Sequence, residues 1–543
     1  MDGMTPDLLT PLLQRQRLAH ARRVPDYAQR IDDLKRLRAA VKRRQEDIVT
    51  AIAADFGRRS RHETLISDVM TVLHDIDYAV RKLKGWMKPR RVMPDINFLP
   101  AGAQIRYQPV GVVGIISPWN YPVNLALMPL AAALAAGNHV MIKPSELTPK
   151  TSDLLKALLA EVFPEERVAV VLGGPEVAAE FSALPFDHLF FTGSTQVGRL
   201  VMQAAAKNLT PVTLELGGKS PAIVAPDYPI DTAAARLTAG KFLNAGQTCI
   251  APDYVLCHES KVDELVAAFE REIKERYPSL ATTPDYTSVA SDRQYARLQG
   301  LLAEAEAGGA RVIRMNPAQE TLAPETRVMA PTLVLGAKED SRLMREEIFG
   351  PILPILPYKH LDEAIAYVNA HDRPLALYHF DLDRARVEQV LDRTIAGGVT
   401  INDCVLHIAQ SALPFGGIGP SGIGHYHGHH GFLTFSKQKP VFYQARWSSF
   451  SLLKPPYKGL ADFVIKFLTR GFGAAASACA RARSCKFCVG PRKNCRTGGS
   501  GARRGSPAYP RQSGRRDGGS AASGDSRAPV KRSLLQSCLR CVS

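Results

Sequence analysis

Apolar residues change their spacing along the chain near Pro94. Between residues 26 and 85 they recur every three or four positions among charged residues, which predicts amphipathic helices. The positions that carry this pattern are Ile31, Leu34, Leu37, Val41 and Ile48. After Pro94 the apolar runs become short and are bounded by Gly and Pro, which is typical of strands.

Five short apolar runs alternate with helical segments over residues 110–216. The expected strands are Val110–Ile116, His139–Lys143, Val168–Leu172, His188–Thr192 and Pro211–Leu216. Helices are expected after Pro122, from Thr148 as N-cap with Pro149 at the first helical position, and from Gly193. The alternation predicts parallel βαβ units in an open, doubly wound α/β sheet. Such a sheet binds ligands beyond the carboxyl ends of its strands.

A second α/β region follows the first. Residues 232–244 are expected to form a helix that leads into Cys249, and strands and helices alternate again to about Asn402. The segment Leu413–Gly431 contains too much glycine for regular structure, and Phe432–Tyr443 is expected to be a closing strand.

The sequence favours a cytoplasmic protein without a membrane span. The longest apolar stretch, Leu125–Gly137, is too short to cross a bilayer and contains Pro129, so a buried helix is the better interpretation. Met1–Leu18 has no continuous apolar core of the kind that a signal peptide needs. Before the C-terminal tail the cysteines are few and scattered, which fits a reducing compartment. They are Cys249, Cys257 and Cys404.

The formal charge of +17 is concentrated in residues 471–543. This tail holds 15 Lys and Arg against 2 Asp and Glu, whereas residues 1–470 hold 54 basic and 50 acidic residues. Gly, Ser, Arg and Ala dominate it, so we expect it to be disordered. Nucleic-acid binding by the tail is an alternative function, but its aromatic residues are not regularly spaced, so we expect no specific nucleic-acid partner. Zinc binding is a further alternative, through Cys485, Cys488, Cys495, Cys538 and Cys541.

Two segments carry candidate catalytic chemistry. Cys249 follows a Gly-Gln-Thr turn after a helix, where an exposed, activated thiolate can form, although a buried cysteine is more often an inert small hydrophobe. Glu215 stands between apolar residues at the end of an expected strand, and burial would raise its pKa enough to make it a base near neutral pH. The alternative for Glu215 is a salt bridge with Lys219.

A stiff turn with two prolines, Ser117–Pro122, follows the first expected strand. Asn120 within it can donate an amide hydrogen bond from a fixed place, which suits an oxyanion hole, or it can satisfy its own turn.

Three further segments suit a dinucleotide. Gly193 and Ser194 begin a helix after a strand, where free N–H groups bind a pyrophosphate or a plain N-cap forms. Lys143 and Glu146 end another strand, where they can hold ribose hydroxyls or form an ordinary solvated strand end. Glu347 and Phe349 can hold a second ribose and line a ring, or form an ordinary helix end. A formal G-x-G-x-x-G at residues 417–422 has no strand-to-helix turn around it, so we interpret it as a glycine loop.

Taken together, these segments resemble the aldehyde dehydrogenase superfamily from about residue 25 to residue 470. P-W-N-Y-P, K-P-S-E, F-T-G-S-T, L-E-L-G-G-K, G-Q-T-C and E-E-I-F-G-P occur in the order of that family. Within it, Leu413–Gly417 and His425–Gly428 look like the class 3 branch, and the chain is most similar to the bacterial coniferyl aldehyde dehydrogenases. Because that loop holds no metal in the family, we expect no metal at His425, His427, His429 and His430.

The resemblance implies NAD(P)-dependent oxidation of an aldehyde to a carboxylate through a cysteine thioester. Cys249 would be the nucleophile, Glu215 the general base and Asn120 the oxyanion donor. The cofactor, NAD with NADP also possible, would be held by Trp119, Lys143, Glu146, Gly193, Ser194, Gly198, Glu347 and Phe349. The substrate would be a coniferyl-type aromatic aldehyde, with a long-chain fatty aldehyde as the alternative. Transfer of the acyl group to coenzyme A is a further alternative. Glu215 is evidence against it, because hydrolysis of the thioester needs that base.

The resemblance also implies a domain organisation and a homodimer. Residues 1–94 and 109–216 would form a Rossmann-like cofactor domain, and residues 217–408 an α/β catalytic domain. Residues 95–108 and 409–447 would form a small β arm for oligomerisation, followed by a helical segment at 448–470 and the tail. We expect Cys404 and His407 to line the substrate funnel.

The tail is expected to be dispensable. Every segment with a candidate catalytic or cofactor-binding residue ends before or at Pro351, and the closing strand also precedes residue 471. A chain stopped after Arg470 should keep its turnover and its dimer mass in light scattering, and it should bind less to cation exchangers. Loss of activity or dissociation of the truncated chain would show that the tail docks on the rest of the protein.

Overall fold

The computed structural model describes residues 8–457 and 459–469. The chain divides into two compact units, Met1–Pro456 and Tyr457–Ser543. In the second unit, helix α17 (Gly459–Thr469) is described, while the expected disordered tail and its cysteines lie outside the described residues. No helix in the described ranges combines the length and the apolar character needed to cross a bilayer.

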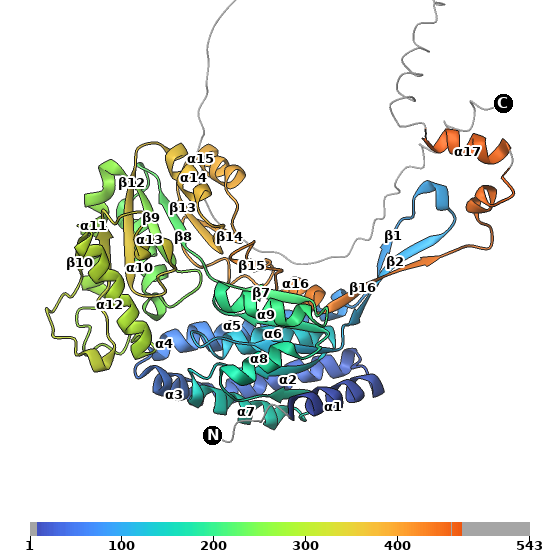
Figure 1. Cartoon of the computed structure of the whole chain (residues 1–543), viewed down its shortest axis with the longest axis horizontal. Coiled ribbons are helices and arrows are strands. Elements are labelled where there is room, and N and C mark those ends of the chain that lie inside the picture. Colours follow the sequence, from blue (N-terminus) through green and yellow to red (C-terminus); the bar gives the residue numbers. More distant parts are fainter. Residues whose placement is uncertain (1–7, 458, 470–543) are drawn as a thin grey trace, which may run out of the picture. The chain divides into compact units, whose positions relative to one another are not determined.

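The N-terminal region is helical, as the spacing of its apolar residues predicts (Figure 1). The helices are α1 (Leu9–Arg22), α2 (Tyr27–Arg43), α3 (Gln45–Phe56), α4 (Arg61–Thr64), a π-helical turn (Leu65–Met70) and α5 (Thr71–Trp86). The chain breaks between α3 and α4 at Gly57, whose φ of +77° favours glycine. Helix α1 was not expected from the sequence because its exposed face is strongly polar; its buried Leu9, Leu12 and Leu13 pack on the first large sheet.

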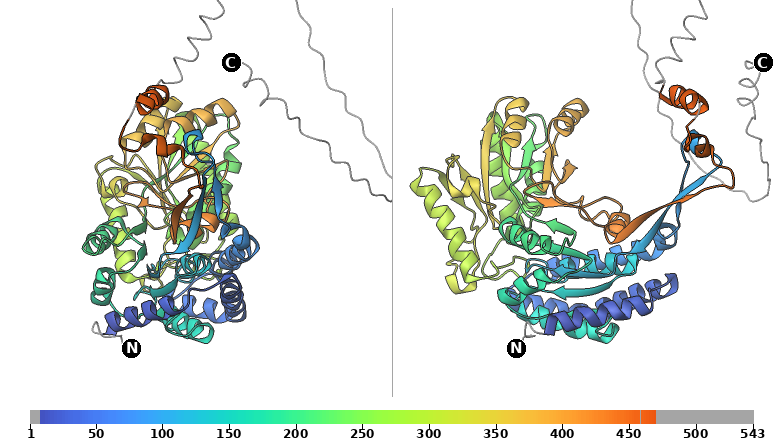
Figure 2. Two further views of the ribbon diagram at one scale, coloured as in Figure 1. Left: turned by 90° about the vertical axis from the view of Figure 1, so that its right-hand side faces the viewer. Right: turned by 45° about the vertical axis from the view of Figure 1, so that its right-hand side comes forward.

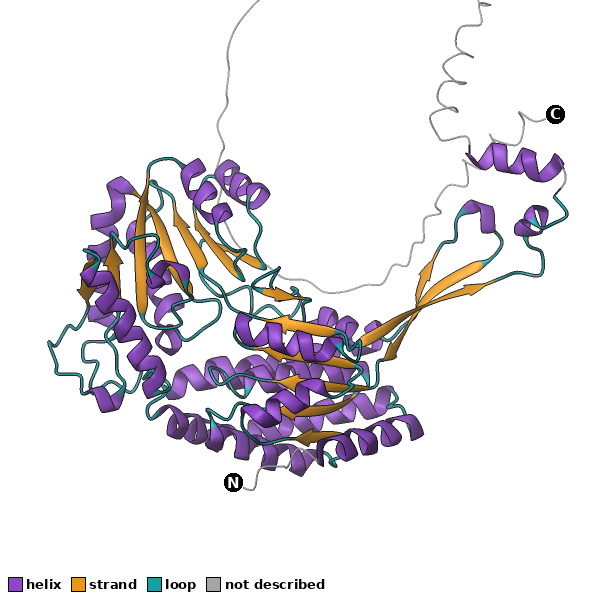
Figure 3. Ribbon diagram, in the orientation of Figure 1, coloured by secondary structure: helices purple, strands orange, loops and turns teal. Residues whose placement is uncertain are grey.

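The first large sheet has six strands in the order β15-β7-β6-β3-β4-β5. They are β3 (Val112–Ile116), β4 (His139–Lys143), β5 (Val168–Val170), β6 (His188–Thr192), β7 (Val212–Glu215) and β15 (Gly422–Ile423). Figure 3 draws the strands in orange between purple helices. The five strands expected over residues 110–216 are confirmed and run parallel, and β15 joins β7 as an antiparallel edge. The expectation of an open parallel sheet is therefore confirmed.

Helices cover both faces of this sheet, which explains the near-continuous apolar strands. The connecting helices are α6 (Asn124–Ala136), α7 (Pro149–Val162), α8 (Pro175–Ala183) and α9 (Thr195–Ala206). In β3, Val113 and Ile115 face the side of α2, α5, α6 and α7, whereas Val112 and Ile116 face α1, α8 and α9. Thr148 is the N-cap of α7 and Pro149 its first residue, as expected, but the Thr148 side chain makes no capping bond. Asp55 of α3 instead accepts hydrogen bonds from the first turn of α7.

The second large sheet has seven strands in the order β10-β11-β12-β9-β8-β13-β14, and only the edge strand β10 is antiparallel to its neighbour. Its strands are β8 (Ser220–Val224), β9 (Pro252–His258), β10 (Arg311–Arg314), β11 (Thr332–Leu335), β12 (Ile352–Tyr358), β13 (Ala376–Phe380) and β14 (Gly398–Ile401). Its helices are α10 (Ile230–Phe242), α11 (Val262–Arg276), α12 (Asp292–Ala307), α13 (Arg342–Arg345), α14 (Leu361–Ala370) and α15 (Arg384–Arg393). The expected second α/β region is confirmed.

A separate sheet of three strands, which we call the arm sheet, extends away from the two large sheets (Figure 2). It consists of β1 (Arg90–Val92), β2 (Gly102–Pro109) and β16 (Ser436–Tyr443) in the order β1-β2-β16. Strand β16 pairs with β2 along its whole length, from Ser436 opposite Pro109 to Tyr443 opposite Gly102.

Three expected boundaries around the arm are wrong. Strand β1 lies before residue 95 yet belongs to the arm sheet, and β15 lies within 409–447 yet belongs to the six-stranded sheet. The closing strand does not begin at Phe432, because Gly428–Thr434 form helix α16, which packs against α5 and α6 and buries Phe432. For the same reason, the glycine-rich segment 413–431 is not entirely irregular. The helical segment expected at 448–470 contains a short 3-10 helix, Ser449–Leu453, and α17.

Candidate active site

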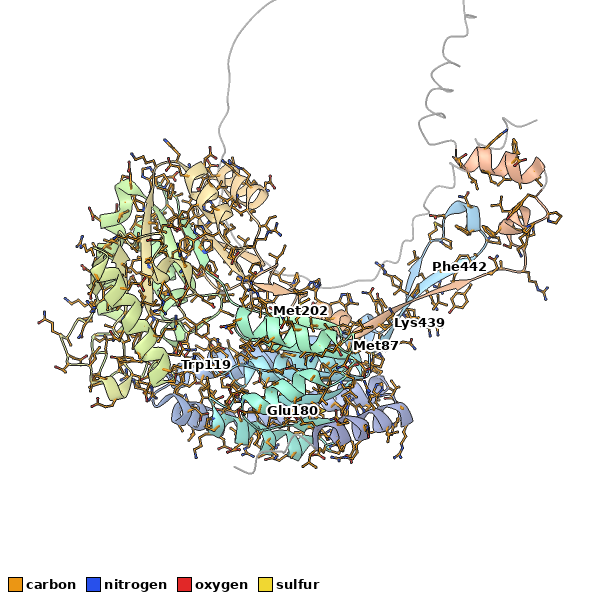
Figure 4. All side chains as sticks on the ribbon, in the orientation of Figure 1. Met87, Trp119, Glu180, Met202, Lys439 and Phe442 are labelled. Carbon is orange, nitrogen blue, oxygen red and sulfur yellow. The ribbon has the colours of Figure 1, made fainter. Side chains whose placement is uncertain are left out.

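A cavity of about 220 Å³ lies where the strand ends of the two large sheets meet. Eight of the eleven candidate site residues line it, which brings together segments that are up to 230 positions apart in the sequence. They are Trp119, Asn120, Gly193, Ser194, Glu215, Cys249, Glu347 and Phe349. We call this space the central cavity; Trp119, which borders it, is labelled in Figure 4.

The turn after β3 holds Asn120 by contacts to the segment before Cys249, and not by bonds within its own turn. The Asn120 side-chain nitrogen donates to the carbonyl of Gln247 at 3.1 Å. The next residue, Tyr121, shares a hydrogen bond of 2.6 Å with the Thr248 hydroxyl. Because an amide nitrogen carries two hydrogens, the second N–H of Asn120 can serve an oxygen bound in the central cavity.

Cys249 follows three residues with left-handed backbone conformation. The φ angles are +53° at Asn244, +51° at Ala245 and +73° at Gly246. The Gln247 side chain closes this turn by donating to the carbonyls of Asn244 at 2.9 Å and of Ser288 at 3.1 Å. A Cβ at Gly246 would lie 2.3 Å from the Gly350 carbonyl oxygen, so glycine is required for the turn to pack on the loop that carries Glu347.

The described residues around Cys249 do not lower the pKa of its thiol. Burial raises its pKa to about 12, and the negative charges of Glu347 and Glu215 contribute to the increase. The backbone N–H groups of Cys249 and Ile250 act in the opposite direction but are weaker. The sequence could not show this, because both carboxylates come from distant segments.

Glu215, at the end of β7, is buried and has no charged partner among the described residues. Lys219 forms an ion pair with Asp253 instead, so the salt bridge considered for Glu215 is absent. Neither carboxylate oxygen of Glu215 finds a hydrogen-bond donor among the described residues. Burial raises the pKa of Glu215 well above its ordinary value, which makes its carboxylate a stronger base than an exposed one.

The loop that carries Glu347 is fixed by groups from several elements. Lys219 donates to the carbonyls of Leu343 at 2.9 Å and Glu346 at 3.0 Å, and Asp253 accepts from the backbone of Ile348 at 3.0 Å. Gly217 leaves room for the carboxylate, since a Cβ there would lie 2.1 Å from a Glu347 oxygen. Burial and the nearby Asp253 raise the pKa of Glu347 to about 8.

Replacing Glu347 with Gln should speed the alkylation of Cys249 by iodoacetamide at pH ~9. At that pH the Glu347 carboxylate, with its pKa near 8, is mostly charged, and its removal lowers the pKa of the thiol. Because each pKa unit is worth a factor of ten in thiolate, we expect an acceleration of up to about tenfold. The difference should shrink at pH ~6, where Glu347 is protonated. Glu346→Gln, whose carboxylate pairs with Arg342, is the control, and equal rates for all three proteins at pH ~9 would contradict the electrostatic assignment.

Gly193 and Ser194 place the beginning of α9 at the central cavity. The Ser194 hydroxyl accepts a hydrogen bond from the backbone of Val197, as in an N-cap. A Cβ at Gly193 would lie 2.5 Å from the ring of Phe191, so glycine is required at this position. Gly198 does not line the cavity. It faces the Leu216 side chain, since a Cβ at Gly198 would lie 2.6 Å from it.

Lys143 and Glu146 are also outside the central cavity. They form an ion pair with a distance of 2.7 Å at the carboxyl end of β4. Glu146 lines a neighbouring hollow of about 270 Å³, together with Ser145, Leu172 and Gly173. Five of the candidate cofactor residues border the central cavity and Glu146 borders the neighbouring hollow, and both spaces lie at the same edge of the six-stranded sheet, as an elongated ligand requires.

The structure adds residues to the cavity that the sequence did not indicate, and it removes others. Gln294 and Arg297 of α12 line the central cavity, and Arg297 also donates to the carbonyls of Glu347 and Ile348. Gln294 and Arg297 are three residues apart, a spacing found on any helix face, so the sequence gives no signal for them. Cys404 and His407, expected in the substrate funnel, do not line this cavity: Cys404 is buried against Gly240, and His407 is hydrogen-bonded to Thr400.

The chain matches the sequence model of the aldehyde dehydrogenase family over residues 18–441. The chain belongs to this family. It is 51% identical over 464 residues to the probable coniferyl aldehyde dehydrogenase of Pseudomonas aeruginosa, which covers 85% of this chain and 96% of that protein. It is 47% identical to the coniferyl aldehyde dehydrogenase of a Pseudomonas species, over 82% of this chain and 93% of that protein. Among solved structures, Staphylococcus aureus AldH in its substrate-bound state is 39% identical with a TM-score of 0.80, over 84% of this chain and 99% of that one.

The protein is therefore an NAD(P)-dependent aldehyde dehydrogenase with the fold of that family. The described residues fit a dinucleotide. One oxygen of the Glu347 carboxylate is buried and has no hydrogen-bond partner among the described residues. The Thr192 hydroxyl, beside Gly193, is likewise buried without a hydrogen-bond partner there. Both residues line the central cavity, where a bound cofactor can supply the missing hydrogen bonds.

Proposed function

We propose that Cys249, Glu215 and Asn120 are the catalytic residues of this aldehyde dehydrogenase. The observation that carries the proposal is their convergence on one cavity of about 220 Å³ from three separate segments. Trp119, Gly193, Ser194, Glu347 and Phe349 would hold the nicotinamide half of the cofactor in this cavity, and Lys143 and Glu146 the adenosine ribose in the neighbouring hollow. The bound cofactor supplies the acceptor for the hydride that the aldehyde loses.

The proposed steps use the groups of the cavity in turn. The Cys249 sulfur, once it has lost its proton, adds to the aldehyde carbon, and the second N–H of Asn120 stabilises the oxygen that becomes negative. When the aldehyde C–H bond has lost its hydrogen with both electrons, the carbon remains as a thioester on Cys249. Glu215 then takes a proton from water, the hydroxide attacks the thioester, and the C–S bond breaks to release the carboxylate.

We propose a coniferyl-type aromatic aldehyde as the substrate. The names of two relatives that are 51% and 47% identical over most of their length support this choice. The test compares kcat/KM for coniferyl aldehyde, cinnamaldehyde, benzaldehyde and a long-chain alkyl aldehyde, each with NAD and with NADP. A preference of at least about tenfold for the coniferyl compound, equal to ~1.4 kcal/mol in the transition state, is expected. A preference for the alkyl aldehyde would refute the substrate proposal but not the reaction.

We propose that the arm sheet pairs two copies of the chain. Strand β16 is an edge strand of eight residues, and its Phe442 and Tyr443 are about half exposed. A long edge strand with exposed apolar residues needs a partner, because its free N–H and C=O groups otherwise invite uncontrolled association. Lys439 and Phe442 are labelled on this strand in Figure 4.

Phe442→Asp should dissociate the proposed dimer. The substitution occurs twice in a twofold interface, so a loss of ~2 kcal/mol per copy would weaken association roughly 10³-fold. Light scattering at micromolar concentration should then give the monomer mass. Leu382→Asp, at a residue that is 69% exposed and belongs to the turn before α15, is the control and should keep the dimer. A Phe442→Asp protein with unchanged mass would remove β16 from the interface.

We propose that the protein acts in the cytoplasm. The described cysteines, Cys249, Cys257 and Cys404, are all free thiols, and the proposed reaction requires that Cys249 stays reduced. Fractionation of the native host, followed by detection of the protein with an antibody, tests this assignment.

A further inference from the structure

Arg59 is a buried arginine close to the central cavity but distant from it in sequence. It lies between α3 and α4, and its side chain has no exposed surface. The guanidinium is stacked between the rings of Phe56 and Tyr121, each with its centroid 5.0 Å away. None of the sequence motifs includes this residue, so its burial requires an explanation.

One nitrogen of Arg59 connects the two segments that carry Asn120 and Cys249. Its Nη1 donates to the carbonyl of Asn120 at 3.0 Å and to the side-chain oxygen of Asn244 at 2.7 Å. Asn244 in turn donates from its side chain to the carbonyls of Asn120 at 3.0 Å and Gln247 at 3.1 Å. The Asn120 carbonyl thus accepts from both residues, and the left-handed turn before Cys249 is tied to the turn of Asn120.

Two buried carboxylates support this connection from the same N-terminal segment. Glu63 accepts from the backbone of Asn244 at 3.1 Å, at the first residue of the left-handed turn. Asp68, 3.5 Å from Arg59, accepts from the backbones of Val123 and Asn124 at 3.1 Å each, directly after the Asn120 turn. Arg59, Glu63 and Asp68 therefore hold both turns from one side.

The alignment of the two turns is needed because they belong to different sheets. Asn120 follows β3 of the six-stranded sheet, whereas Cys249 precedes β9 of the seven-stranded sheet. An oxyanion donor must be in place before charge develops on the substrate, and an error of ~1 Å in such an arrangement can lower the rate about 10²-fold. We propose that Arg59 is a positioning residue that sets the place of the Asn120 amide relative to Cys249. The inference rests on the roles proposed above for Asn120 and Cys249.

The test is Arg59→Lys, which keeps a positive charge but replaces the planar, stacked fork by a single ammonium group. We expect kcat/KM for aldehyde oxidation to fall about 10- to 100-fold. Alkylation of Cys249 by iodoacetamide needs the thiolate but no oxyanion donor, so its rate should stay within about threefold of wild type. An unchanged kcat/KM, or an alkylation rate that falls as much as turnover, would overturn the proposal.

A double variant shows whether Arg59 acts through Asn120. Asn120→Ala removes the donor, so adding Arg59→Lys to it should lower kcat/KM by less than about threefold, whereas independent effects would multiply. The control is Arg167→Lys, which changes another buried arginine that bonds Asp33 and the Asn138 carbonyl away from the cavity. It should lose stability but keep kcat/KM. Multiplying effects, or an equal loss in the control, would refute the positioning role.

Asn244→Gly tests the same connection between the two turns if Arg59→Lys does not fold. Glycine adopts the φ of +53° without strain and removes the oxygen that Arg59 binds, together with the amide that donates to the Asn120 and Gln247 carbonyls. The same fall in kcat/KM with a nearly constant alkylation rate is expected, and wild-type kcat/KM would refute the proposal. Cys249→Ala in the same series distinguishes a failure of the proposed function from a failure of the positioning role. If Cys249→Ala remains active, the nucleophile assignment fails, whatever the effect of Arg59→Lys.

Discussion

The Cys249→Ala protein is expected to lose aldehyde turnover by at least about 10⁴-fold, because it lacks the atom that forms the covalent intermediate. Its affinity for NAD should remain within about twofold of wild type, since the groups expected to hold the cofactor come from other segments. These groups include Lys143, Ser194 and Glu347. The measurements are steady-state NADH formation and a fluorescence titration with NAD.

Cys404→Ala is the matched control for this prediction. Its thiol is buried against Gly240, and Cys404 does not line the central cavity, so turnover should be retained even if some stability is lost. Turnover near the wild-type rate in Cys249→Ala would remove Cys249 as the nucleophile. A combined loss of turnover and of NAD binding would show that the substitution disturbs the whole cavity, and the assignment would then lack support.

The large sheets could be predicted because their residues are constrained locally. Strands such as Val112–Ile116 are buried on both faces, so every position must be apolar or small, and this pattern is visible without any knowledge of the partners. The same holds for Leu125–Ala136, where all residues of the helix after Asn124 are buried. Motifs at the ends of these strands could be placed at one edge because parallel strands end together.

The arm boundaries could not be predicted in the same way. Arg90–Val92 is short and exposed, and Gly422–Ile423 has only two residues, so neither carries a pattern. The sheet that each joins is decided by pairing with strands far along the chain. The helix Gly428–Thr434 was hidden by its glycines, because it is stabilised by packing on α5 and α6 and not by helix propensity.

In the candidate site, too, local sequence patterns indicate some features, whereas others depend on distant segments. The sequence indicated Cys249 and Glu215, but the high pKa of the Cys249 thiol depends on burial and on two carboxylates from other segments. Arg59 carries no motif, and its contacts to Asn120 and Asn244 arise only when three distant segments are folded together. Residues that hold the catalytic groups in place are thus the part of the site that local patterns miss.

Glu215→Gln should form thioester but hydrolyse it slowly. Gln keeps the size of the side chain and cannot take a proton from water, so steady-state turnover should fall about 10²- to 10⁴-fold. A rapid burst of about one NADH per subunit should precede the slow phase, because the first half of the reaction does not need this base. Stopped-flow absorbance resolves the two phases. Glu180→Gln, at an exposed site on α8 (Figure 4), is the control and should behave as wild type.

The same substitution should also change the dependence of stability on pH. Burial raises the pKa of Glu215 in the folded protein, so the folded state binds more protons than the unfolded state as the pH rises above the ordinary Glu value of ~4.3. The contribution of Glu215 to the free energy of unfolding therefore decreases between pH ~4.3 and its raised pKa. The Gln protein has no such contribution. We expect Glu215→Gln to raise Tm more at pH ~8 than at pH ~5, by an amount on the order of 1–3 °C. Steady-state turnover within a few-fold of wild type, or the same Tm difference at both pH values, would show that Glu215 is not the buried general base.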